Sequence, residues 1–369
     1  MTILLMPYMD CPLRCEYCFE KPVLGTKIEA NIDAMTTVLN RIYARGAGVS
    51  LHGGEPLAAP IEHVEALLQA IYRLMGRSGV QTNGLLITDR HIRLFKRYCT
   101  HVGISMDGPP ELSVLRRFKD RVESGREVAK KVNENIAKLR ENGISVGILC
   151  VLGRHNAGDE EKLGKLFEWV EWLRSIGVSG GRFLVLKACE PRLEEYTLTP
   201  EEVGRVWIYL YRRLRKIGWE CAWSPFRDFI NALKGKTGQV VCWLGCCDPW
   251  LTKACHPIFP DGTTGLCDRT FIRGLYLRPE GQPLEIRAEI LKETDCKGCK
   301  WWGYCHGGCP YDAVDNDWRN KSSLCPAIKM LFEEISRYYP PTSKPTETRE
   351  GYRHGDSPHR DWSNHGDSG

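Results

Sequence analysis

Short apolar runs alternate with longer helix-periodic stretches along roughly the first 220 residues of the chain. The apolar runs have the length of β-strands and span residues 2–7, 47–53, 79–84, 101–107, 144–152 and 181–188. Between them, residues 62–75, 126–143 and 159–177 carry apolar side chains three and four positions apart, as amphipathic helices do. This alternation predicts an α/β fold in which parallel strands curl into a partial or full (β/α) barrel.

The pattern changes in the second half of the chain. After a helical stretch at 200–218 the periodicity fades, and residues 242–325 contain ten cysteines together with many Gly, Pro and Trp residues. A loop-rich region of this kind buries little apolar surface and is typically held together by bound metal. We therefore expect a barrel domain at 1–220, a bridging segment at 221–245, a metal-stapled domain at 246–339 and a disordered polar tail at 340–369.

Composition indicates the cellular compartment of the protein and therefore the chemical state of its cysteines. No segment is long and apolar enough for a transmembrane helix, and the N-terminus lacks the basic region of a signal peptide, so we expect a cytoplasmic protein without membrane contact. In that reducing compartment, the 17 cysteines are expected to bind metal or perform redox chemistry rather than form disulfides. The charged residues, 51 Lys and Arg against 46 Asp and Glu without a basic block, give no indication of nucleic-acid binding.

Three cysteines, Cys11, Cys15 and Cys18, form a C-x3-C-x2-C motif directly after the first predicted strand. This position suits a catalytic role, because barrel active sites form at the C-terminal ends of the strands. A [4Fe–4S] cluster usually takes four thiolates, so three ligands would leave one iron open for a substrate. Spacing alone leaves a zinc site, completed by a distant His or Cys, as the alternative.

The motif, with Tyr17 before its last cysteine, resembles the signature of the radical S-adenosylmethionine (SAM) enzymes. The resemblance implies a [4Fe–4S] cluster whose open iron binds SAM and, once reduced, cleaves it to a 5′-deoxyadenosyl radical. Three further motifs, HGGEP, QTNG and SMDGP, follow in the order found in that family. They imply that SAM is bound by Gly53, Gly54, Glu55, Pro56, Thr82, Asn83, Ser105 and Asp107.

The C-terminal cysteines resemble the SPASM extension of the same family, which binds two auxiliary [4Fe–4S] clusters and would bring the total to three. The core motif C-x2-C-x5-C-x3-C begins at Cys296, and Gly262 and Cys267 match the upstream G-x4-C motif. The resemblance assigns Cys296, Cys299, Cys305 and Cys325 to one cluster, and Cys246, Cys255, Cys267 and Cys309 to the other. Cys242 and Cys247 are further candidates for the second set. In isolation, the paired cysteines would also suit a zinc ribbon.

The resemblance also implies a function. SPASM enzymes mostly act on peptides or proteins, so we expect oxidative modification of a peptide or protein residue, such as a thioether or carbon–carbon cross-link. An electron donor such as flavodoxin or ferredoxin would be a second partner. An anaerobic sulfatase-maturing enzyme is an alternative, favoured by CHGGCP and by Asp268, a candidate base directly after Cys267. The remaining alternatives are a maturase of a small-molecule or metal cofactor and a non-catalytic iron–sulfur electron carrier, and the SAM motifs count against the carrier.

Overall fold

The computed structural model describes residues 2–21, 24–25, 28–121, 123–188, 190–245, 247, 255–265, 267 and 283–342. Within these residues, one eight-stranded sheet has the strand order β7-β6-β5-β4-β3-β2-β1-β8. All neighbouring strands are parallel. The strands are β1 (Thr2–Leu5), β2 (Gly48–Leu51), β3 (Ser78–Thr82), β4 (Thr100–Ser105), β5 (Val146–Leu152), β6 (Gly181–Val185), β7 (Trp223–Ser224) and β8 (Cys255–Ile258).

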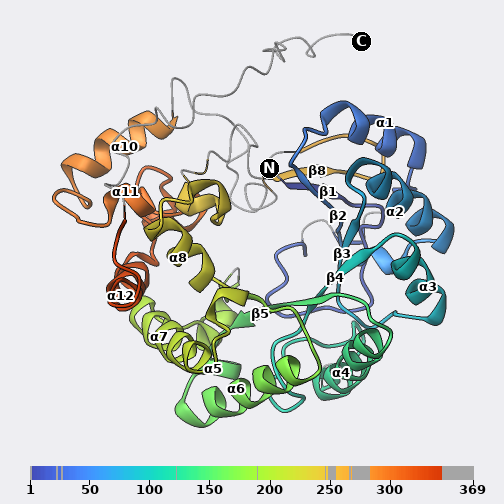
Figure 1. The fold of residues 1–369 in the computed structure, drawn as a ribbon, viewed down its shortest axis with the longest axis horizontal. Helices are drawn as coiled ribbons and strands as arrows, with labels where there is room; N and C mark the ends of the chain where they lie inside the picture. The colour runs from blue at the N-terminus through green and yellow to red at the C-terminus, as the bar shows by residue number, and fades with distance from the viewer. Residues whose placement is uncertain are drawn as a thin grey trace.

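Helices line the outer side of the curved sheet and follow most of its strands in the chain (Figure 1). They are α1 (Ile32–Ile42), α2 (Ile61–Met75), α3 (Asp89–Arg97), α4 (Gly125–Glu141), α5 (Arg154–Ala157), α6 (Glu160–Ser175), α7 (Pro200–Lys216) and α8 (Phe226–Leu233). Three more helices, α10 (Pro283–Glu293), α11 (Trp302–Cys305) and α12 (Cys325–Ser336), belong to the cysteine-rich part of the chain.

Local sequence signals explain where several helices begin and end. The side chains of Asn31 and Asp159 accept hydrogen bonds from main-chain N–H groups in the first turns of α1 and α6. Thr199 and Glu202 form a capping box at the start of α7, and Pro200 takes the first helical position. α2 ends at Gly76, whose φ of 68° fits the left-handed conformation of a helix cap.

The core lies between the sheet and its helices. Six of the seven residues of β5 are buried, as expected for a central strand of a parallel sheet that is covered on both faces. The last helix, α12, packs against α7 and α8 and so ties the cysteine-rich region to the barrel. One contact in this interface is the pair of hydrogen bonds from the exposed side chain of Arg212 in α7 to the buried carboxylate of Glu334, at 2.7 and 2.8 Å.

The sequence prediction of an α/β fold with parallel strands is confirmed. The barrel is partial, because β7 and β8 are the two ends of the strand order and do not pair with each other. These two strands come from the ranges 221–245 and 246–339, so both ranges contribute to the sheet, and the division into domains stays a prediction. None of the described helices is both long and apolar enough to cross a lipid bilayer.

Candidate active site

The three-cysteine loop directly follows β1 and is pinned to the segment after β4. Leu13, between the first two cysteines, is 1% exposed and forms a β-bridge with Phe118. The N–H of Arg14 donates to the carbonyl of Arg117 at 2.9 Å, and the N–H of Glu16 donates to the carbonyl of Leu115 at 3.0 Å. The loop therefore has a defined shape that rests on main-chain pairing with another loop.

The three thiols lie close to one another in a largely buried place. Burial raises the pKa of Cys11 to about 11 and that of Cys18 to about 12, and it also raises the pKa of Cys15. The charge of Cys15 adds to the rise at both of the other two thiols. Since metal ligands must be deprotonated, a cation at this place would release protons from the thiols. In the described part of the chain, no three His, Cys, Asp or Glu side chains form a ready site for a single metal ion.

The predicted glycine turn lies directly against the cysteine loop. Gly54 donates its N–H to the carbonyl of Tyr8 at 3.1 Å, and Glu55 donates its N–H to the carbonyl of Asp10 at 2.9 Å. A Cβ atom on Gly54 would lie 2.4 Å from the carbonyl oxygen of Asp10, so only glycine allows this approach. Gly53 has a φ of 117°, which other residues rarely adopt.

Glu55 is a fully buried carboxylate that joins this turn to the end of β3. It accepts hydrogen bonds from the N–H of Leu57 at 3.0 Å, the hydroxyl of Thr82 at 2.7 Å and the N–H of Asn83 at 2.7 Å. Burial raises its pKa, while these donors act in the opposite direction. Asn83 in turn points its amide nitrogen at the thiol of Cys11, 3.5 Å away. The turn, the end of β3 and the cysteine loop thus form one connected unit.

Asp107 follows β4 and contacts the cysteine loop through Tyr17. Its carboxylate accepts a hydrogen bond from the Tyr17 hydroxyl and another from the N–H of Val151 at 2.9 Å. Ser105, the last residue of β4, accepts a hydrogen bond from the Gln81 amide at 2.8 Å. The strand-end residues that the sequence singled out therefore lie at the same edge of the sheet as the three cysteines. Their contact with SAM stays a prediction.

Arg116 belongs to this site although no sequence motif pointed to it. Its side chain is buried and donates a hydrogen bond to the Tyr17 hydroxyl oxygen at 3.1 Å. Burial acts against its charge, yet the pKa of Arg116 is raised well above its usual value, because the neighbouring acidic groups of Cys15, Tyr17 and Asp107 favour its charged form. Within the described residues, the Nε atom of Arg116 is buried and has no hydrogen-bond partner.

His155 is the second residue that the motifs missed. It lies at the end of β5, 7% exposed, with its ring 6.4 Å from that of Tyr17 and 6.4 Å from that of Tyr196. Burial lowers the pKa of His155 to about 4, so the ring is neutral at physiological pH. Neither ring nitrogen has a hydrogen-bond partner among the residues that the structure describes. The only available sequence signal was the position of a polar RHN tripeptide directly after an apolar strand.

These features fit a polar ligand and an iron–sulfur cluster. Buried polar atoms are nearly always hydrogen-bonded in proteins, so the unpaired nitrogens of Arg116 and His155 suit a molecule with both a negative group and polar ring atoms. SAM has an amino-acid carboxylate and an adenosyl group. Three neighbouring thiols suit a cluster that leaves one iron for that molecule.

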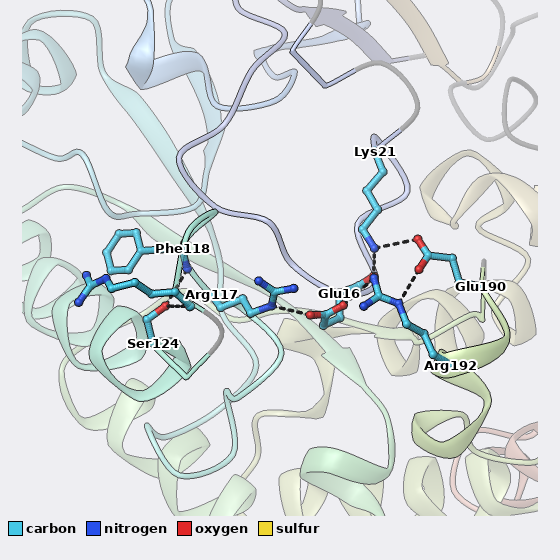
Figure 2. A network of polar contacts seen from close by, with 8 residues as sticks. Glu16, Lys21, Arg117, Phe118, Ser124, Glu190 and Arg192 are labelled. Atoms are coloured by element: carbon cyan, nitrogen blue, oxygen red, sulfur yellow. Dashed lines mark hydrogen bonds and ion pairs between the residues drawn. The ribbon is translucent and has the colours of Figure 1, made fainter.

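A network of charged side chains borders the site (Figure 2). Glu16, between two of the cysteines, binds Arg117 through one carboxylate oxygen and Arg192 through the other, the second at 2.9 Å. Arg192 also contacts Glu190 at 2.6 Å, and Glu190 binds Lys21 at 3.0 Å. The network connects the cysteine loop to the segments that follow β4 and β6, so it fixes three strand-end loops relative to one another.

Four of the C-terminal cysteines influence one another electrostatically, and their role as cluster ligands stays a prediction. Burial raises the pKa of Cys296 to about 11, and the charges of Cys325 and Cys299 add to the rise. Burial likewise raises the pKa of Cys305 to about 12, with the same three cysteines contributing. Cys296, Cys299, Cys305 and Cys325 thus lie within range of one another's electrostatic influence.

Cys247 is influenced by three other C-terminal cysteines. The pKa of Cys247 is raised well above its usual value by a hydrogen bond with Cys242, by burial, and by the charges of Cys242, Cys309 and Cys267. Cys255 instead begins β8 beside Thr2, at the edge of the sheet opposite the strand ends that form the site. Cys246 and the candidate base Asp268 lie outside the described residues.

Comparison with known proteins decides the family. Residues 5–170 match the radical SAM superfamily. This match assigns residues 5–170 to the radical SAM superfamily. Over 377 residues it is 22% identical to the cysteine-type anaerobic sulfatase-maturating enzyme of Clostridium perfringens (strain 13 / Type A), covering 90% of this chain and 95% of that enzyme. It is 26% identical over 365 residues to the serine-type enzyme of Klebsiella aerogenes, covering 88% and 82%.

Solved structures agree with the radical SAM assignment of the fold. The structure described as native anSMEcpe with bound AdoMet and Cp18Cys peptide superposes with a TM-score of 0.69 at 18% identity, covering 92% of this chain and 97% of that one. Streptococcus suis SuiB bound to precursor peptide SuiA gives a TM-score of 0.59 at 15% identity, covering 88% and 75%. The expectation of a radical SAM enzyme with a C-terminal SPASM region is thus confirmed, and a SAM-binding [4Fe–4S] cluster follows from the family.

Proposed function

We propose that this radical SAM enzyme oxidises a residue of a peptide or protein and uses three [4Fe–4S] clusters to do so. The observation that carries the proposal is the presence, in one chain, of the three-cysteine loop and two further groups of four cysteines. When bound, the first cluster and SAM supply a 5′-deoxyadenosyl radical that removes a hydrogen atom from the substrate. An oxidised product then requires the loss of one more electron and one proton, and an auxiliary cluster held by four cysteines would supply an acceptor for the electron.

Residues of the first site have separate tasks in this proposal. Cys11, Cys15 and Cys18 hold the first cluster, and the cation of Arg116 binds the carboxylate of SAM. His155 offers its unpaired ring nitrogens to the adenosyl group. The amide of Asn83, 3.5 Å from the Cys11 thiol, stabilises the sulfur ligand. Glu55 serves as a support, because its carboxylate joins the glycine turn to the end of β3 through Leu57, Thr82 and Asn83.

To most of the other residues that were predicted to bind SAM we assign the task of positioning the loops of the site. Gly53 and Gly54 allow the turn to approach the cysteine loop, and Pro56 begins the short helix that continues from it. Thr82 and Asp107 hold the ends of β3 and β4 in place. Ser105 remains a candidate contact for SAM at the end of β4.

For the auxiliary clusters we propose two sets of cysteines. One set is Cys296, Cys299, Cys305 and Cys325, as the SPASM resemblance implied. For the other we propose Cys242 and Cys247 together with Cys267 and Cys309, in place of Cys246 and Cys255. This choice rests on the charge interactions of Cys247 with the other three thiols and on the position of Cys255 at the opposite edge of the sheet.

Peptide substrates are suggested by the relatives. The solved structures named above hold peptides, one described as Cp18Cys peptide and the other as precursor peptide SuiA. Formylglycine formation on a sulfatase is the second candidate, favoured because the matches to sulfatase-maturating enzymes extend over 88% or more of this chain. In that reaction a Ser or Cys side chain loses a proton, and Asp268 would be its acceptor. An external donor such as flavodoxin or ferredoxin would supply the electron for SAM cleavage.

The decisive experiment uses anaerobically reconstituted protein, SAM, a chemical reductant and two classes of peptide. One is a Cys-x-Pro-x-Arg peptide, and the other is a short peptide encoded beside this gene. We expect 5′-deoxyadenosine to form with wild-type protein and not with the triple alanine variant of Cys11, Cys15 and Cys18. Loss of two hydrogens from the neighbouring peptide supports cross-linking, whereas an aldehyde on the Cys-x-Pro-x-Arg peptide supports sulfatase maturation. Nucleoside formation by the triple variant would contradict the proposal.

Asp268 separates the two candidate reactions further. The Asp268→Asn variant keeps the shape of the side chain and removes its basicity. If the enzyme matures sulfatases, this variant should cleave SAM at the wild-type rate but form little aldehyde. Wild-type aldehyde yield in the variant would exclude Asp268 as the base.

A further inference from the structure

Arg287 of α10 is a buried arginine at the centre of the loops that carry the last group of cysteines. Its side chain is 4% exposed. Its guanidinium donates hydrogen bonds to five main-chain carbonyl oxygens, those of Trp318 at 2.8 Å, His306 at 3.0 Å, Gly307 at 3.0 Å, Gly308 at 3.2 Å and Asn320 at 2.9 Å. Three of these carbonyls lie between Cys305 and Cys309, and the other two lie in the segment that leads to Cys325.

The CHGGC sequence explains how one side chain reaches so many carbonyls. His306, Gly307 and Gly308 have φ values of 47°, 79° and 75°, so three consecutive residues are in the left-handed region. A Cβ atom on Gly307 would lie 2.4 Å from Leu291 Cδ1 and 3.2 Å from Arg287 Nη2. The turn therefore requires glycine, and it brings the carbonyls of successive residues to the guanidinium.

The charge of Arg287 acts on the cysteines as well as on the loops. Its guanidinium lies 3.0 Å from the carbonyl oxygens of His306 and Gly307, the two residues that directly follow Cys305. A guanidinium remains protonated at every physiological pH, so this charge is permanent. Reduction of an iron–sulfur cluster adds one negative charge, which a nearby buried cation stabilises strongly because the surroundings have a low dielectric constant.

We propose that Arg287 is a positioning residue for the auxiliary cluster held by Cys296, Cys299, Cys305 and Cys325: it fixes the ligand loops and its permanent charge raises the reduction potential of that cluster. This inference rests on the proposed function, because it takes these four cysteines as ligands. The fork of five N–H donors is required for the first task, and the positive charge alone is sufficient for the second. Lysine could therefore replace arginine in one task and not in the other.

Two variants separate these tasks. Arg287→Gln removes the charge and most of the donors, while Arg287→Lys keeps the charge on an ammonium that cannot reach both loops. The measurements are the rate of iron loss to a chelator under anaerobic conditions and the midpoint potential of the cluster, followed by EPR. In Arg287→Gln we expect iron loss about tenfold faster or more and a more negative potential. In Arg287→Lys we expect similarly fast iron loss with a potential close to that of the wild type.

Arg319→Gln is the matched control. Arg319 lies in the same segment, its side chain is 55% exposed, and it pairs with Asp317 at 2.5 Å rather than with the carbonyls. This variant should behave as wild type in both measurements. An Arg287→Gln protein with the wild-type potential, or an Arg287→Lys protein that retains iron as long as the wild type, overturns the inference. If Arg287→Gln does not fold, the iron loss of Arg287→Lys decides.

Failure of the proposed function gives a different result. In that case the wild-type protein would hold about eight irons instead of about twelve, and Cys296→Ala would not lower the iron content. The inference then falls together with the three-cluster proposal. If Cys296→Ala does remove about a third of the iron while the Arg287 variants match wild type, the inference falls alone.

Discussion

The Tyr17 hydroxyl donates a hydrogen bond to the buried carboxylate of Asp107 and so joins the cysteine loop to the end of β4. The same hydroxyl oxygen accepts a hydrogen bond from Arg116 at 3.1 Å. One phenol therefore lies between a buried cation and a buried carboxylate, two residues after Cys15. Removing the hydroxyl leaves Asp107 without one hydrogen-bond donor and Arg116 without one acceptor.

The first prediction follows from this arrangement. Tyr17→Phe should lower the free energy of unfolding of the cluster-free protein by about 1.5–3 kcal/mol, the usual contribution of a buried hydrogen bond to a charged group. Urea denaturation measures the change. Tyr196→Phe is the control, because Tyr196 also packs its ring against His155 but is not part of this contact. Equal losses in the two variants would contradict the role assigned to the hydroxyl.

Glu16 offers an internal comparison between two ion pairs of one carboxylate. The side chains of Glu16 and Arg117 are 14% and 16% exposed, whereas that of Arg192 is 56% exposed. Loss of Arg117 leaves the largely buried carboxylate of Glu16 with only the exposed Arg192 as its partner, so Arg117→Gln should lower the free energy of unfolding by up to about 3 kcal/mol. Arg192→Gln should lower it by less than about 1 kcal/mol, because solvent screens that pair. Denaturation of both variants at low salt checks the order, and the reverse order would refute it.

Gly54 should not tolerate even one methyl group. Gly54→Ala would place a Cβ atom 2.4 Å from the carbonyl oxygen of Asp10, so the turn or the cysteine loop must move. We expect the variant to lose about a third of the iron of the reconstituted protein, the share of the first cluster. Gly164→Ala is the control, because its Cβ would have no neighbour within 4 Å. It should keep all iron and gain about 1 kcal/mol in stability, as alanine favours a helix over glycine.

Single cysteine variants test the ligands of the other auxiliary cluster. Cys247→Ala should lose about a third of the iron, because Cys247 lies with Cys242, Cys267 and Cys309. Cys255→Ala should keep the full iron content. Cys255 is the first residue of β8 and pairs with Thr2 of β1, away from the strand ends that carry the site. Iron analysis after anaerobic reconstitution gives the answer. A loss in Cys255→Ala with no loss in Cys247→Ala would restore the set expected from sequence.

The interface between α7 and α12 should weaken in acid. The hydrogen bonds from Arg212 lower the pKa of Glu334 below its ordinary value of 4.5, although burial opposes this shift. Because the pKa of Glu334 is lower in the folded state than in the unfolded state, its pair with Arg212 stabilises the protein fully above about pH 4.5. This stabilisation is lost as the pH falls toward the folded-state pKa of Glu334. Arg212→Gln should remove this part of the pH dependence. Thermal unfolding between neutral and acidic pH measures it, and identical pH profiles for variant and wild type would disprove the assignment.

Much of the fold could be predicted because most strands and helices have a hydrophobic pattern within their own short stretch of sequence. Each of the six apolar runs named from sequence contains or overlaps one of the strands β1 to β6. The motifs containing Gly54, Asn83 and Asp107 could be placed correctly at the strand ends because they directly follow these runs. The four-residue strand β8 was not predicted, since it lies in a loop-rich region and is defined by its pairing with β1.

The missing parts of the site depend on long-range contacts. Arg116 lies in an irregular loop, and its burial results from the pairing of that loop with the cysteine loop. His155 has no special sequence neighbours, and only the approach of Tyr17 and Tyr196 encloses it. Arg287 occupies a helix whose charged residues are otherwise typical of a solvated surface. Burial of a charged side chain by distant segments has no local sequence signal.

The position of β1 between β2 and β8 has a consequence for biosynthesis. β1 is synthesised long before its partner on one side, which begins only at Cys255. Until residue 258 has left the ribosome, one edge of an apolar strand lacks its hydrogen-bonding partner, and such edges invite wrong pairing. The loop that carries Cys11, Cys15 and Cys18 continues from β1, so the strand that anchors this loop is complete only after β8 has paired with it. Iron delivery to these thiols should therefore follow the emergence of β8, and the nascent chain needs protection until then.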